Sequence, residues 1–232
     1  MDEVTICIPV FKRHEFLRLT LHNIKTQTYP HNKLTVLIDE CLSDEPFIRK
    51  GEYEDIVKYL HPIKVIHKVY SKRATIGEKR NRLVKASPSK YIQFFDSDDY
   101  YRRDCISYNH ELLKSRGVKC VGSDKMIFCY TQDEFRLCAI DCGNKPHMIH
   151  EATLFFEKKW FRSTNGFLKN SKGEGQNLFQ GISHKSICIS DIGKVMMCLV
   201  HSSNTVKKDR FKQKDMPKLD EDTRIFIENM LR

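Results

Sequence analysis

Two aspartates spaced two residues apart, Asp96 and Asp98, are the side chains of this sequence best placed to do chemistry. They follow directly on Tyr91-Ile92-Gln93-Phe94-Phe95, an apolar run typical of a buried strand. In a bend after a strand, both carboxylates can converge on one divalent cation, or on a ribose hydroxyl and that cation. An isolated acidic triplet is more commonly a solvated turn. Here the preceding strand and a second strand-end aspartate, Asp39, favour a functional acidic site.

A basic segment precedes this acidic pair and could bind the phosphates of a ligand. Its lysines and arginines surround Gly77, where we expect a helix to begin: Lys72, Arg73, Lys79, Arg80 and Arg82. A helix N-terminus with basic side chains nearby favours phosphate oxygens. An ordinary solvated helix face remains the alternative for this segment.

The elements that would position these residues alternate between strand and helix in the first half of the chain. The patterns predict strands at 4–10, 34–38, 64–69 and 91–95, and helices at 14–27, 51–60, 78–86 and 105–116, the last with Asp104 as its N-cap. This alternation predicts an α/β fold with a mostly parallel, doubly wound sheet. Because ligands bind beyond the carboxyl ends of such strands, Asp39 and Asp96 should share the ligand edge.

The second half is less regular. Short strand signals at 125–130, 135–140, 152–156, 187–190 and 194–200 predict a mixed sheet with long loops, and 220–231 is expected to be a final helix. We therefore expect one domain at 1–205, with a donor-binding half at 1–105 and an acceptor half at 106–205. Residues 206–232 are interpreted as a basic connector followed by the final helix.

Composition narrows the class of protein without naming a ligand. The 232 residues suffice for one sizeable core, and 40 Lys and Arg against 30 Asp and Glu give a net charge of +10, which suits an anionic partner. Nine scattered cysteines in mostly apolar surroundings indicate reduced thiols and a cytoplasmic protein. We expect no signal peptide and no membrane span, because the chain has neither a basic and apolar leader nor an apolar run of about 18 residues.

Taken together, five motifs in order make the sequence resemble family 2 of the glycosyltransferases, which have the GT-A fold of nucleotide-diphospho-sugar transferases. The motifs are Ile6-Cys7-Ile8-Pro9-Val10-Phe11-Lys12-Arg13, Gln27-Thr28-Tyr29-Pro30, Val36-Leu37-Ile38-Asp39-Glu40 with Ser43-Asp44, Ile76-Gly77-Glu78-Lys79-Arg80-Asn81, and the strand leading into Asp96-Ser97-Asp98-Asp99. Each motif alone is weak. Their shared order over residues 1–105 makes the resemblance specific.

The resemblance implies a donor site for a nucleoside-diphosphate sugar, with uracil as the expected base. The residues it assigns to the donor are Pro9, Val10 and Phe11 beside the nucleotide, Asp39 on the base, Arg80 near the nucleotide or its diphosphate, Asp96 near the ribose, and Ser97 between the two aspartates. Asp98 would ligate Mn²⁺ or Mg²⁺, which neutralises charge on the departing diphosphate. Glu40-Cys41 departs from the Asp-Gly that the family more often has, which weakens any statement about the base.

For the acceptor half, the resemblance implies a general base and a second metal ligand. Glu174 is the expected base, which would deprotonate the acceptor hydroxyl and give inversion at the anomeric carbon. The family usually has Glu-Asp at this point, whereas this chain has Glu174-Gly175, so Glu151 and Asp191 are kept as reserves. His201, near the end of the catalytic core, is the expected second metal ligand.

Two further constellations rank lower. Cys138, Cys142, His147 and His150 are four zinc-ligand types, but their spacing is more compressed than that of usual zinc sites. The basic tract 207–214, with the apolar Ile225, Phe226, Met230 and Leu231, could form a weak membrane-surface contact, although a solvated linker is the more common reading.

The function expected from the sequence is therefore an inverting, metal-dependent glycosyltransferase acting on an acceptor of unknown class, and three alternatives stay open. A nucleotidyltransferase normally has a Gly-rich basic loop after its first strand, which Pro9-Val10-Phe11-Lys12 is not. A nucleic-acid-binding protein should gather its basic residues on one face, and here they are spread along the chain, so no nucleic-acid partner is expected. A relative that binds a nucleotide sugar without transferring it is the third alternative.

Overall fold

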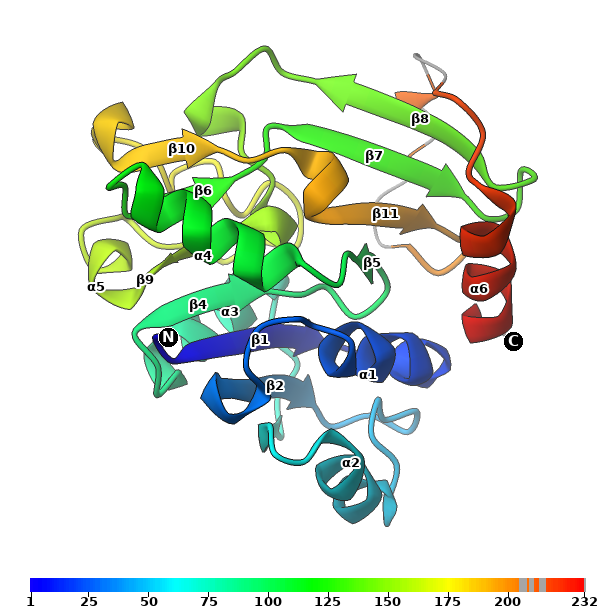
Figure 1. The fold of residues 1–232 in the computed structure, drawn as a ribbon. Coiled ribbons are helices and arrows are strands. Elements are labelled where there is room, and N and C mark those ends of the chain that lie inside the picture. The colour runs from blue at the N-terminus through cyan, green and yellow to red at the C-terminus, as the bar shows by residue number, and fades with distance from the viewer. Residues whose placement is uncertain (205–207, 209–210, 213–215, 232) are drawn as a thin grey trace.

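Strands and helices alternate through the first half of the computed structural model, which describes residues 1–204, 208, 211–212 and 216–231 (Figure 1). The strands are β1 (Val4–Val10), β2 (Leu34–Cys41), β3 (Lys64–Tyr70), β4 (Tyr91–Phe94), β5 (Tyr100–Tyr101), β6 (Cys120–Gly122), β7 (Lys125–Tyr130), β8 (Arg136–Asp141), β9 (Phe155–Glu157), β10 (Ile187–Ile189) and β11 (Met196–Val200). The α-helices are α1 (Leu17–Lys25), α2 (Glu52–Leu60), α3 (Ile76–Ala86), α4 (Cys105–Ser115), α5 (Lys158–Phe161) and α6 (Glu221–Leu231).

Within the described residues the main sheet has seven strands in the order β10-β6-β9-β4-β1-β2-β3. The pairs β1–β2, β2–β3, β1–β4 and β6–β10 are parallel, and only β9 runs antiparallel to its two neighbours. The predicted α/β class with a mostly parallel central sheet is confirmed. A smaller sheet in the order β5-β11-β7-β8 stands beside it and carries much of the irregular second half.

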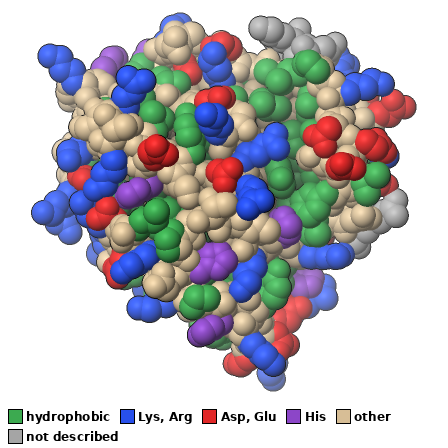
Figure 2. All heavy atoms as spheres, in the orientation of Figure 1, with side chains coloured by type: hydrophobic (Ala, Val, Ile, Leu, Met, Phe, Trp, Pro, Cys, Tyr) green, Lys and Arg blue, Asp and Glu red, His purple; other side chains and the backbone are tan. Residues whose placement is uncertain are grey.

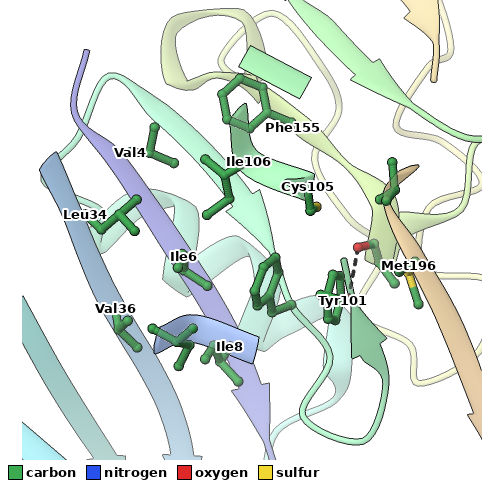
Figure 3. Packing of buried hydrophobic residues seen from close by; sticks show 14 of the residues in the cluster. Val4, Ile6, Ile8, Leu34, Val36, Tyr101, Cys105, Ile106, Phe155 and Met196 are labelled. Atoms are coloured by element: carbon green, nitrogen blue, oxygen red, sulfur yellow. Dashed lines mark hydrogen bonds between the residues drawn. The ribbon is translucent and has the colours of Figure 1, made fainter. Parts of the chain in front are cut away.

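The two faces of the main sheet bury alternate residues of β1, as the period of a strand requires. Val4, Ile6 and Ile8 pack in the cluster that includes side chains of α1, α2 and α4, whereas Cys7 faces Leu83 of α3 on the opposite face. Figure 3 shows the first face, where side chains of β1 and β2 meet Ile106 and Phe155. Because both faces are covered, β1 and β2 are mostly apolar and are buried along their whole length.

The final helix packs on the protein instead of presenting an apolar face to a membrane. Ile227 is fully buried, and Phe226, Met230 and Leu231 lie against a core cluster that contains residues of α1, β7 and β11. Ile225 is the one residue of the expected membrane-contact set left exposed, at 43%. The apolar patch predicted for a membrane surface is therefore not formed by the residues assigned to it.

Several boundaries in the second half differ from the sequence predictions. The strands β5 and β6 are too short to have given a periodic signal. The strand expected at 152–156 is a 3₁₀ turn at Glu151–Thr153 followed by β9, and the one expected at 194–200 begins at Met196 after a 3₁₀ turn at Ile192–Lys194. Asp104 lies at the N-cap of α4 but makes no capping bond, because its carboxylate accepts from Thr28. The predicted connector at 206–218 falls largely outside the described residues.

The start of α3 holds the segment around residues 166–176 against the sheet. Thr75 and Glu78 form a reciprocal capping box, and the Gly77 N–H donates to the Asn170 carbonyl at 3.0 Å. A Cβ built on Gly77 would lie 1.8 Å from the Leu168 carbonyl oxygen. Only a glycine lets the two backbones approach this closely, so α3 and this segment are fixed relative to each other.

Replacing Gly77 by alanine should therefore destabilise the protein, although alanine is the better helix former. We expect Gly77→Ala to lower the free energy of unfolding by about 2 kcal/mol, measured by urea denaturation, because the backbone carbonyl must move. Gly193→Ala is the control, since its Cβ would meet only Asp191 Oδ1 at 3.4 Å. Unchanged stability in Gly77→Ala would mean that the close approach does not exist in solution.

Candidate active site

A cavity of about 1200 Å³ lies at the carboxyl ends of β1 and β4, between the main sheet and the smaller one. Eight of the ten residues assigned to the site from sequence line it: Pro9, Val10, Phe11, Arg80, Asp96, Ser97, Asp98 and Glu174. The other two are not among the lining residues. His201 contacts Asp98, which is, and Asp39 lies in the adjoining strand β2. Parallel strands thus bring the predicted residues to one edge, as their positions implied.

One oxygen of Asp98 is the focus of several donors. Its Oδ2 accepts from the Arg13 guanidinium and from the Asn204 amide at 3.3 Å, and His201 Nε2 lies 3.1 Å away. Burial opposes ionisation of this carboxyl, but the contacts with His201 and Arg13 outweigh it and lower its pKa to about 2. Asp98 is therefore an anion held ready for a cation.

The donor set around Asp98 fits a divalent metal ion that has few protein ligands. A carboxylate oxygen and an imidazole nitrogen are groups that Mn²⁺ accepts, and Arg13 already places a positive charge on the same oxygen. Among the described residues, no three His, Cys, Asp or Glu side chains converge as a ready-made metal site. This also holds for the Cys138–His150 stretch. A metal at Asp98 and His201 would thus need further oxygens from diphosphate and water.

Arg80 joins the two predicted carboxylates at the centre of the cavity. Its Nη2 donates to Asp96 at 2.9 and 3.2 Å, and its Nε lies 3.4 Å from Glu174 Oε1. The Arg80 side chain is 2% exposed, and its guanidinium carbon Cζ lies 4.8 Å from the centroid of the Phe94 ring. Arg80 is therefore not part of a solvated helix face. It is a buried cation that connects Asp96 to Glu174.

Glu174 faces the cavity together with its reserve, Glu151. Burial raises the pKa of Glu174 despite the opposing charge of Arg80, and Glu151 adds to the rise. Glu151 Oε1 accepts from the Gly175 N–H at 3.0 Å, and a Cβ on Gly175 would lie 2.2 Å from that same oxygen. The carboxylate of Glu151 thus fills the space that a side chain at 175 would need, which gives a physical reason for the Glu-Gly departure.

The second reserve, Asp191, has a structural role in this fold. Its carboxylate caps the turn Ile192–Lys194 by accepting from the Gly193 N–H at 3.0 Å. It is not among the residues that line the cavity. The choice of base therefore narrows to Glu174 and Glu151.

Asp39 is engaged with a basic residue rather than open to the cavity. Arg82 donates to both of its oxygens, at 2.7 and 2.9 Å, and Asp39 is only 1% exposed. Burial raises the pKa of Asp39 even so. The base of a nucleotide could hydrogen-bond to the carboxylate of Asp39 only if Arg82 moved. The neighbouring Glu40 is also occupied, since its Oε2 lies 2.8 Å from His67 Nε2.

Two basic residues of the site escaped the sequence reasoning. Arg13 and Lys12 both have a left-handed backbone, with φ of 69° and 59° respectively. Residues other than glycine rarely adopt this conformation. Arg13 lies just beyond β1, at the ligand edge of the sheet, and this position in the sequence could have identified it as a site residue. Lys208 places its Nζ 2.7 Å from the Sγ of Cys198 on β11, ten residues earlier in the chain, a contact that no periodic pattern of the sequence indicates.

A model of the family described as glycosyl transferase family 2 matches residues 5–172. The chain belongs to glycosyltransferase family 2. Two curated relatives are the poly(ribitol-phosphate) β-N-acetylglucosaminyltransferase TarS of Staphylococcus aureus, 22% identical over 66% of this chain, and the poly(ribitol-phosphate) β-glucosyltransferase of Bacillus spizizenii, 25% identical over 68%. This chain spans 28% and 26% of their respective lengths.

Solved structures of family 2 glycosyltransferases and similar enzymes confirm the GT-A fold. S. aureus TarS 1–349 in complex with UDP-GlcNAc aligns with a TM-score of 0.64 at 14% identity, over 90% of this chain and 63% of that one. The mannosyltransferase PcManGT of Pyrobaculum calidifontis, in complex with GDP-Man and Mn²⁺, gives 0.63 at 16% identity, over 90% and 59%. At these identities the likeness shows the fold alone.

The surface of this family 2 member does not gather its positive charge on the face seen in Figure 2. Lysines and arginines are interspersed there with acidic side chains and with apolar ones. In the part of the chain that the structure describes, no helix is both long and apolar enough to cross a bilayer.

Asp99 generates a prediction about pH and stability. Burial and the charge of Asp98 raise its pKa to about 7, so the folded protein binds more protons than the unfolded chain between about pH 4 and pH 7. Stability should therefore fall as pH rises through this window. Asp99→Asn keeps an oxygen for the Leu199 N–H and removes the charge, so its gain in stability over wild type should be greater at pH 8 than at pH 5, by more than about 1 kcal/mol.

Urea denaturation at the two pH values measures this difference. Asp55→Asn, at an exposed position on α2, is the matched control and should leave the pH dependence unchanged. If Asp99→Asn also leaves it unchanged, the buried carboxyl does not titrate as described.

Proposed function

We propose that this chain is an inverting, metal-dependent glycosyltransferase that transfers a sugar from a UDP-linked donor to a hydroxyl acceptor. The observation that carries the proposal is that one cavity is lined by Asp98, which contacts His201, and by the buried Glu174, which Arg80 connects to Asp96, two residues before Asp98. Family membership supports transfer of a sugar. The relative TarS, solved with UDP and with UDP-GlcNAc, supports UDP as the nucleotide.

The donor would lie along the ends of β1, α3 and β4. Pro9, Val10 and Phe11 line the cavity there, and Arg73 lies over the Phe11 ring at 4.4 Å. Asp96 would contact the ribose, as the family resemblance implies. Lys12, Arg13 and Arg73 supply positive charge for a diphosphate. The neighbouring solved structure with GDP-Man and Mn²⁺ supports the use of a divalent cation.

Asp98 and His201 would hold that cation, which when bound supplies charge neutralisation to the leaving diphosphate. Arg13 must then leave the Asp98 oxygen, and its length lets it turn toward the diphosphate. The strained backbone at Lys12 and Arg13 is consistent with a segment that has two arrangements.

Glu174 is the residue we assign to proton abstraction from the acceptor hydroxyl. Its raised pKa makes it a stronger base than an exposed glutamate, and the nearby Arg80 keeps it oriented. Attack from the side opposite the leaving group gives inversion. A Glu174 remote from the donor carboxylates would have favoured the relative that binds a nucleotide sugar without transferring it, and the contact of Arg80 with both Asp96 and Glu174 weighs against that alternative.

The donor assignment predicts stabilisation by ligand. At 100 times its dissociation constant, UDP with Mn²⁺ should stabilise the protein by about 2.7 kcal/mol, a rise in Tm of about 5–10 °C. Asp98→Asn should abolish the Mn²⁺-dependent part, whereas the exposed Asp55→Asn should retain it. No shift with any uridine, guanosine or thymidine diphosphate would remove the donor assignment.

The base assignment predicts a separate defect. Glu174→Gln should lower the rate of UDP release from a UDP-sugar about 10²–10⁴-fold while the donor-induced Tm shift stays intact. Because the carboxylate must be ionised, the wild-type rate should rise with pH through a pKa above the ordinary value of 4.5, and this limb should be absent from the variant. A larger loss in Glu151→Gln than in Glu174→Gln would transfer the role to Glu151.

A further inference from the structure

The cavity has a second wall that the donor does not explain. It is formed by β7, β8, the segment 147–152 and Phe211, and its apolar side chains are Met126, Phe128, Ile140, Met148, Ile149 and Phe211. This wall is continuous with the position of Glu151 and Glu174, where the acceptor hydroxyl would be deprotonated. What lies against it is therefore the remainder of the acceptor.

Charge in the cavity is unevenly divided between the two sides. Six of the eight lysines and arginines that line it among the described residues come from the donor side, namely Lys12, Arg13, Arg49, Arg73, Lys79 and Arg80. The other two are Lys172, on the loop beside Glu174, and Lys208, whose Nζ contacts Cys198 and lies 5.9 Å from the centroid of the Phe128 ring. On the second wall itself, burial lowers the pKa of His150 to about 4, so this imidazole is neutral at pH 7. Among the described residues the positive charge thus lies mainly on the donor side, where it suits an anionic donor, whereas on the second wall the cation of Lys208 lies over Phe128 beside neutral apolar side chains.

The accessible side chains of the apolar wall are Ile140, Met148 and Phe211, whereas Met126, Phe128 and Ile149 are at most 6% exposed. Phe128 and Phe211 stack on each other, with ring centroids 4.9 Å apart and planes within 3°, so each covers one face of the other. Met148, by contrast, is 45% exposed beside the cavity, although large apolar side chains are normally buried. Methionine and isoleucine side chains adapt to flexible alkyl groups more readily than they form a flat surface for a ring.

From this wall we propose that the acceptor carries its hydroxyl on an aliphatic group, an alkyl glycoside or a lipid, instead of on a phosphate-rich polymer. The inference rests on the proposed function, because it takes the group beside Glu174 to be the acceptor. It departs from the curated relatives, whose names specify poly(ribitol-phosphate). Binding would bury alkyl carbons against Met126, Ile140 and Met148.

The test is a series of alkyl β-glucosides that share one sugar and differ only in chain length, from methyl to octyl, below their micelle concentrations. Calorimetry on the wild-type protein should show Kd falling about three- to fourfold per added methylene. Met148→Ser should flatten this dependence. Leu42→Ser, which changes an apolar side chain that is 64% exposed and outside the cavity lining, should not.

Further ligand comparisons and a thermal-shift measurement distinguish aliphatic binding from other causes of the calorimetric signal. Hexyl glucoside should bind more tightly than phenyl glucoside, and octyl glucoside more tightly than a glycerol-phosphate oligomer; the reverse order in either comparison overturns the aliphatic assignment. The UDP and Mn²⁺ thermal shift is measured on the same protein. A flat series with this shift intact overturns the acceptor class alone, whereas loss of the shift overturns the proposed function and with it the acceptor assignment.

Discussion

The buried guanidinium of Arg80 is the contact on which the site depends. A cation taken out of water is tolerated only when its charge is paired, and here Asp96, at Nη2, and Glu174, at Nε, provide the pairing. Asp96 follows β4, Glu174 belongs to the segment held by the start of α3, and Arg80 is on α3 itself. One side chain therefore sets the geometry between Asp96 and Glu174, the residues that we propose to act on donor and acceptor.

Burial then divides the neighbouring carboxyls into different roles. Asp98 has donors on its Oδ2, and its pKa is lowered, whereas burial and the charge of Asp98 raise that of the adjacent Asp99. The pKa of Glu174 is raised by burial in spite of the opposing charge of Arg80. Asp98, which stays ionised, and Glu174, whose pKa is raised, thus line one cavity. The proposed sugar transfer requires both kinds of carboxyl, one to bind a cation and one to accept a proton.

The parallel half of the fold and most of the site could be predicted because their signals are local. β1, β4 and the stretch 34–38 of β2 are mostly apolar runs, Asp39 follows that stretch directly, and Asp96 and Asp98 follow β4. The pairing of Asp39 with Arg82 and the contact of Arg13 with Asp98 could not be predicted, since each joins segments distant in sequence. The contact of Lys208 with Cys198 spans only ten residues, but no periodic pattern of the sequence indicates it. The strands β5 and β6, of two and three residues, are set by tertiary pairing and leave no periodicity.

A double-mutant cycle between Arg80→Met and Glu174→Gln tests the central claim most directly, with the free energy of unfolding from urea denaturation as the readout. If Arg80 compensates the charge of Glu174, Arg80→Met leaves buried carboxylates unpaired, and the added Glu174→Gln relieves part of that cost. The expected coupling energy is more than about 1 kcal/mol. Additivity within about 0.5 kcal/mol would show that the two side chains do not interact and would contradict this account of the site.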